Sequence, residues 1–137
     1  MPRNQVGLKT LSAMMFLVVS LASCDGDIGL GPDNQLEVTS AVDNFQFQVS
    51  NMESVSETLS YTWQNNGTQA TIDISQAITA GSAILTIRDA DGTVVHQEDI
   101  AEDNDTDTAA GVAGAWSIEV RIQSVTGTFN FRVQKTT

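Results

Sequence analysis

The sequence has few of the residues on which most catalytic and metal sites depend. It holds one cysteine, Cys24, and one histidine, His96. A single cysteine excludes a disulfide within the chain, and a single histidine excludes a zinc site built on several imidazoles. His96 lies in a strand-like run, so we expect it to face solvent. Because no G-x-S-x-G motif is present either, the sequence predicts a protein that is not an enzyme.

Basic residues are also scarce. The chain has six Lys and Arg against 17 Asp and Glu. All 17 acidic residues and four of the basic ones follow residue 24, which gives that part a formal charge of −13. Such a charge repels nucleic acid and anionic lipid headgroups. We therefore exclude DNA and RNA as partners.

A long apolar run is absent as well. The longest one covers residues 11–22, follows Arg3 and Lys9, and stops before Cys24 and Asp25. A membrane-spanning helix needs about 20 apolar residues. The run has instead the length and the basic flank of a signal peptide.

Leu21-Ala22-Ser23-Cys24, at the end of this run, resembles the lipobox of bacterial lipoprotein signal peptides. The resemblance implies cleavage between Ser23 and Cys24 and diacylation of the Cys24 thiol. It also implies a membrane-anchored protein of the cell envelope, at the outer membrane, in the periplasm or on the cell surface, with the leaflet left open. Several acyl chains would hold the protein permanently, since a single chain binds a membrane only marginally. An ordinary signal peptide that leaves Cys24 unmodified is the alternative.

Three regions follow from this interpretation. Residues 1–23 are the cleaved signal peptide. Residues 24–35 contain three glycines and a proline and predict a flexible tether that carries the lipidated Cys24. Residues 36–137 are long enough for one domain.

Apolar and polar residues alternate along much of this domain, which is typical of half-buried strands. The clearest runs are residues 45–50, 59–63, 72–74, 116–123 and 129–134. Asn65-Asn66-Gly67, Ala90-Asp91-Gly92 and Thr126-Gly127 supply residues that tight turns need, and Gly81 marks another break. The pattern predicts an all-β domain, a single antiparallel β-sandwich of jelly-roll type with seven or eight strands. A small closed barrel is the alternative.

The segment from Gly81 to Val133 resembles small sandwich domains of the pre-peptidase C-terminal and GOLD kinds. The resemblance rests on strand–turn–strand over residues 81–95 and on two later runs, residues 113–120 and 127–133, that each begin near a glycine. It implies an accessory domain that binds, presents or stabilises other molecules without catalysis.

Three aspartates form a candidate calcium site. Asp103, Asp105 and Asp107 have the first spacings of an EF-hand loop, but Thr108 and Gly114 stand where that loop needs glycine and glutamate. A different calcium geometry and a simple solvated acidic loop both remain open. No other cofactor is expected.

Tyr61 and Trp63 form a second candidate site, because aromatic rings on one strand face can stack on a sugar. Packing of both rings in the core is the alternative. The sequence thus predicts a lipid-anchored, non-enzymatic structural or interaction module of the envelope, with an envelope protein or a glycan as partner. A carbohydrate-binding lipoprotein and a calcium-dependent accessory or adhesion module are the alternatives.

Overall fold

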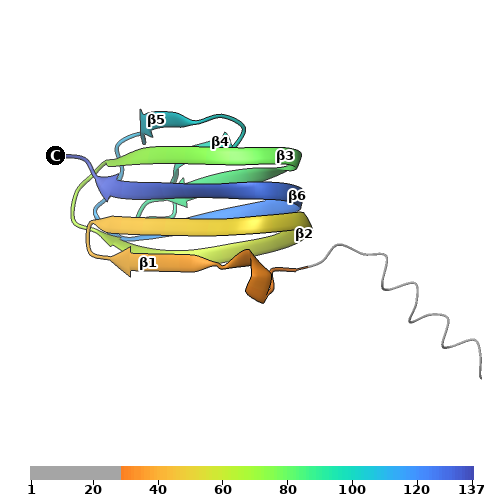
Figure 1. Cartoon of the computed structure of the whole chain (residues 1–137). Helices are drawn as coiled ribbons and strands as arrows, with labels where there is room; N and C mark the ends of the chain where they lie inside the picture. Colours follow the sequence, from red (N-terminus) through yellow and green to blue (C-terminus); the bar gives the residue numbers. More distant parts are fainter. Residues whose placement is uncertain (1–28) are drawn as a thin grey trace, which may run out of the picture.

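The computed structural model describes residues 29–137, so the predicted signal peptide and Cys24 lie outside the described residues. A 3-10 turn, η2 (Pro32–Asn34), precedes six strands (Figure 1). The strands are β1 (Glu37–Ala41), β2 (Asn44–Asn65), β3 (Ala70–Arg88), β4 (Val94–Asp99), β5 (Asn104–Asp107) and β6 (Gly114–Lys135). No helix within residues 29–137 has the length and apolar character needed to cross a membrane.

Three of the strands bend back on themselves. A straight strand of 22 residues, the length of β2 and β6, would extend roughly 70 Å. Instead, the register with neighbouring strands shifts between Val49 and Glu57 in β2 and between Ile78 and Ser82 in β3. The ring of Tyr61 consequently lies 5.5 Å from that of Phe45 on the same strand. Each long strand therefore contributes one half to each of two layers.

The two layers are antiparallel throughout. The first layer consists of β1, residues 44–50 of β2, residues 127–135 of β6, residues 70–78 of β3, and β5. The second consists of residues 55–65 of β2, 114–125 of β6, 82–88 of β3, and β4. Since β1 and β4 end the strand order without pairing with each other, the fold is a β-sandwich, as predicted, and not a closed barrel.

The turn predictions are confirmed in part. The connections at Asn66-Gly67 and Asp91-Gly92 do join separate strands. The turn predicted at Thr126-Gly127 and the break predicted at Gly81 are wrong, because both glycines lie inside continuous strands. Their φ angles of 135° and 80° bend the strand from one layer into the other without reversing it. The strands are consequently fewer and longer than predicted.

Aromatic and β-branched residues fill the space between the layers. Phe47 and Phe131 face each other across β2 and β6, with ring centroids 5.0 Å apart. In the second layer, Trp63 and Trp116 pair across the same two strands with their rings nearly perpendicular. Most residues that the alternating pattern assigns to the inner face are buried, including Ile72, Ile118 and Val133.

The N-terminal segment, residues 29–35, is held against the bend of β2. The Asn34 side-chain amide donates to the carbonyls of Ser50 and Asn51 at 3.1 and 3.0 Å. The Leu30 N–H donates to Glu57 Oε1 at 2.8 Å, and Leu30 packs against the core. This part of the predicted tether is therefore fixed to the domain, which differs from the flexible segment expected from its composition.

Candidate functional site

The outer face of the first layer is polar in every strand. Cross-strand register aligns its exposed side chains in rows that run across the strands. One row comprises Thr39, Gln46, Arg132, Asp73 and Asp105. The neighbouring row comprises Glu37, Gln48, Asn130 and Ser75. The face arises because the inner positions of these strands are apolar, so that alternation turns the polar residues outward.

A shallow depression of about 210 Å³ lies on this face. Its lining residues are Glu37, Thr39, Gln46, Phe47, Gln48, Asp73, Asn130, Phe131 and Arg132. A second depression adjoins it and is lined by Asp73, Ile74, Ser75, Asp103, Asn104 and Asp105. Asp73 belongs to both, so together they form a trough that crosses from β1 to β5.

The amide groups in the trough are available for binding. Within residues 29–137, the side chains of Gln46, Gln48 and Asn130 make no hydrogen bond to the protein. Each amide offers two N–H donors and one carbonyl acceptor. The first depression therefore presents a dense set of neutral donors and acceptors to solvent.

Carboxylates dominate the other end of the trough. Arg132 Nη2 lies 3.8 Å from Asp73 Oδ2, a weak and exposed ion pair. Asp73 and Asp105 face each other directly across β3 and β5. The negative charge of Asp73, together with a hydrogen bond between the two side chains, raises the pKa of Asp105 above its ordinary value.

The predicted calcium site is not formed. Asp103, Asp105 and Asp107 lie at alternate positions along and just before the extended strand β5. Successive members of such a series are separated by about 7 Å, and the Asp103 carboxylate accepts the N–H of Gln76 at 2.8 Å. No group of three carboxylate, histidine or cysteine side chains within residues 29–137 comes together closely enough to hold a metal ion. The prediction is therefore wrong, because a strand keeps apart the oxygens that a loop would gather.

The predicted aromatic platform is not formed either. The Trp63 side chain is 0% exposed, and its indole N–H donates to the carbonyl of Ala41 at 2.9 Å. Tyr61 is half-buried against Phe45 and Phe47. Burial, and secondarily the charge of Glu57, raise its pKa. Core packing, the alternative considered from the sequence, therefore accounts for Trp63, which presents no ring face to a ligand.

His96 does not face solvent as expected. Its Nε2 lies 2.6 Å from Glu98 Oε1, and both side chains are largely buried. Glu98 Oε2 in turn accepts a hydrogen bond from Asn104 Nδ2 at 2.8 Å. Since β4 belongs to the second layer and β5 to the first, these three residues close one edge of the sandwich with polar contacts.

Asp89 organises the loops at the far end of the domain from η2. Its Oδ1 accepts the N–H groups of Asp91 and Thr93, and its Oδ2 accepts the N–H of Val112. These backbone N–H groups, chiefly that of Val112, lower the pKa of Asp89 below its ordinary value. The carboxylate is thus fully used by the fold, which makes its role structural.

Comparisons with known proteins give no assignment at the family level. No family model matches the sequence, and no curated protein matches it significantly. Among solved structures, the chain is similar to TmCBM61 in complex with β-1,4-galactotriose, with 15% identity and a TM-score of 0.45 over 77% of this chain and 82% of that one. It is also similar to a CBM4 structure, with 10% identity and a TM-score of 0.41 over 75% and 79% of the two chains. A chain of the accessory secretory protein 1, 2 and 3 structure from Streptococcus pneumoniae has 9% identity and a TM-score of 0.36 over 82% and 93%. At these values the likeness assigns no site residue to this chain.

Proposed function

We propose that this protein is a non-catalytic glycan-binding module that a lipid on Cys24 anchors in the cell envelope. The observation that carries glycan binding is the first depression, where the amides of Gln46, Gln48 and Asn130 meet the Arg132 guanidinium without partners of their own among residues 29–137. Sugar hydroxyls are both donors and acceptors, as side-chain amides are. A ligand rich in hydroxyl groups therefore matches this surface.

Other ligand classes fit the face less well. An apolar peptide or lipid would find no apolar side chain among the outward residues of the two rows. Nucleic acid is repelled by the charge of the domain. A non-catalytic role is supported by His96, which is bound to Glu98 at the edge of the sandwich, outside the residues that line the trough.

Loss of two amides is the direct test of glycan binding. The double variant Gln46→Ala, Asn130→Ala should bind oligosaccharides about tenfold more weakly, because each lost neutral hydrogen bond contributes about 0.5–1.5 kcal/mol. An oligosaccharide array would find the ligand, and titration calorimetry would measure the change. Calorimetry is preferred to tryptophan fluorescence because Trp63 and Trp116 are both fully buried.

The matched control removes two side-chain amides from the second layer instead of the first. Gln64→Ala with Gln123→Ala removes two exposed amides from the second-layer halves of β2 and β6. This control should bind as the unmodified protein does. Equal weakening by both double variants, or no binding to any glycan of the array, would refute the proposed site.

The anchor rests on the lipobox resemblance and has its own test. Cys24→Ala should abolish labelling by a radioactive or clickable fatty acid and release the protein from the membrane fraction, or leave the precursor uncleaved. Ser20→Ala, in the same signal segment, should change neither property. Retention of both the lipid label and the membrane location in Cys24→Ala would show that the chain is held in another way.

A further inference from the structure

The trough changes its chemistry from one end to the other. The depression over β1, β2 and β6 carries the three amides of Gln46, Gln48 and Asn130 beside the charged side chains of Glu37 and Arg132, whereas the depression over β3 and β5 contains Asp73, Asp103 and Asp105. The two share Asp73 and therefore form one continuous surface. Adjacent strands lie about 4.8 Å apart, so five strands extend the trough across roughly 19 Å. A linear ligand that lies across the strands meets both ends.

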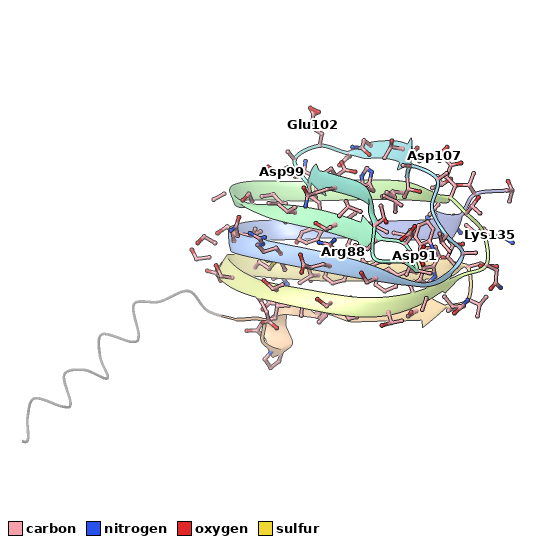
Figure 2. All side chains as sticks on the ribbon, turned by 180° about the vertical axis from the view of Figure 1, so that it is seen from behind. Arg88, Asp91, Asp99, Glu102, Asp107 and Lys135 are labelled. Atoms are coloured by element: carbon pink, nitrogen blue, oxygen red, sulfur yellow. The ribbon has the colours of Figure 1, made fainter. Side chains whose placement is uncertain are left out.

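The acidic end lacks cations to balance it. Arg132, 3.8 Å from Asp73, is the cation that faces it. Of the other basic side chains in residues 29–137, Lys135 lies 3.4 Å from Asp43. Arg88 and Arg121 belong to the second-layer halves of β3 and β6, and Figure 2 labels Arg88. Three carboxylates thus share one distant guanidinium.

The carboxylate pair also has an unfavourable arrangement. Like charges directly opposite each other on paired strands destabilise a sheet, and Asp73 and Asp105 are such a pair. The negative charge of Asp73 accordingly raises the pKa of Asp105 above its ordinary value. A cation bound beside the pair would relieve the repulsion, whereas an anion would increase it.

We propose, on the basis of the proposed function, that the trough selects glycans with protonated amino groups over glycans with carboxylates, and that Asp73 and Asp105 determine this selectivity. The amide end holds the hydroxyl and ring oxygens of the chain. The carboxylate pair receives an ammonium group of a sugar residue farther along it. The ligand class is therefore a linear amino-sugar polymer whose amines are free.

Three oligomers of equal length and different charge test the selectivity. A glucosamine oligomer carries ammonium groups, its N-acetylated counterpart is neutral, and a uronic acid oligomer carries carboxylates. Calorimetry at low salt and at a pH that protonates the amines should give about tenfold tighter binding of the glucosamine oligomer than of its acetylated counterpart, about 1.4 kcal/mol. The uronic acid oligomer should bind most weakly, and added salt should reduce the preference.

The variant Asp105→Asn tests whether Asp105 determines the preference for the glucosamine oligomer. It removes one member of a like-charged pair, so the variant should fold at least as stably as the unmodified protein. Its preference for the glucosamine oligomer should fall severalfold, while its affinity for the acetylated oligomer stays unchanged. Glu53→Gln makes the same change of charge at the bend of β2, away from the trough, and should leave the preference intact.

The outcomes separate this inference from the proposed function. Equal binding of the charged and neutral oligomers, or tighter binding of the uronic acid oligomer, would overturn the selectivity and leave glycan binding in place. An equal loss of preference in Glu53→Gln would show that overall charge, and not the Asp73–Asp105 pair, is responsible, which also overturns it. Binding of none of the three oligomers would overturn both.

Discussion

Replacing Gly127 with alanine is expected to lower the free energy of unfolding by about 2–6 kcal/mol. An alanine Cβ at this position would lie 2.2 Å from the carbonyl oxygen of Ala77 and 2.8 Å from Cα of Ile78, both in the backbone of β3. Crowding of this kind costs about 1–3 kcal/mol. The φ angle of 135° adds about 1–3 kcal/mol for a residue other than glycine. Urea denaturation followed by circular dichroism measures the sum.

Two other glycines distinguish steric crowding from backbone strain as the cause of the expected loss of stability. Gly92 has a φ angle of 87° but nothing within 4 Å of an added Cβ, so Gly92→Ala should cost about 1–2 kcal/mol from backbone strain alone. Gly31 has neither a positive φ nor a close neighbour, so Gly31→Ala should change stability by less than about 1 kcal/mol. If Gly127→Ala unfolds at the same urea concentration as Gly92→Ala, the close approach of β6 to β3 does not require glycine.

Truncation of Trp116 is the second change with a large expected effect. The indole is 0% exposed and packs edge-on against Trp63, with ring centroids 5.9 Å apart. Its N–H donates to the carbonyl of Val112 at 2.7 Å, which holds the loop before β6. Trp116→Ala should lower the free energy of unfolding by about 3–5 kcal/mol.

A conservative variant distinguishes packing from the hydrogen bond. Trp116→Phe keeps an aromatic ring and removes the N–H, so it should cost less than the alanine variant. We expect about 0.5–1.5 kcal/mol for the lost hydrogen bond, because the Val112 carbonyl still accepts the N–H of Ala90 at 3.2 Å. Both variants should also lose the near-ultraviolet circular dichroism of the paired indoles. A stability of Trp116→Ala within about 1 kcal/mol of the unmodified protein would contradict the buried position.

The sequence predicts the layers of this fold well because its strands alternate strictly. Phe45, Phe47 and Val49 all lie in the core, as alternation requires. The sequence does not predict the bends that take β2, β3 and β6 from one layer to the other. A glycine with positive φ serves both a hairpin and a bent strand, so the sequence predicts a break at Gly81 and a turn at Thr126-Gly127 where the structure has bent strands. The choice between the two depends on pairing with distant strands, which local sequence does not encode.

The trough cannot be predicted from the sequence for a related reason. Gln46 and Arg132 are recognisable in the sequence as solvent-facing residues of their strands, but they lie 86 positions apart and become neighbours through the register of β2 with β6. Conversely, residue type alone predicts a sugar-stacking role for Trp63 and a calcium site at Asp103, Asp105 and Asp107. The tertiary fold buries Trp63 and extends the backbone around β5, and these two features exclude the predicted sugar-stacking and calcium-binding roles.

The docking of residues 29–35 onto β2 has a consequence for orientation. If Cys24 carries the proposed lipid, the four residues 25–28 separate the anchor from the fixed segment, and four residues span at most about 14 Å. The N-terminal segment with η2 lies at one end of the strands, and the C-terminus lies at the other end (Figure 1). So short a connection favours strands that stand upright on the bilayer, and the trough, which crosses them, then runs parallel to its surface. Under the proposed function, the glycans in the best position to bind would be those that lie flat along the membrane, as layers, rather than those that project from it.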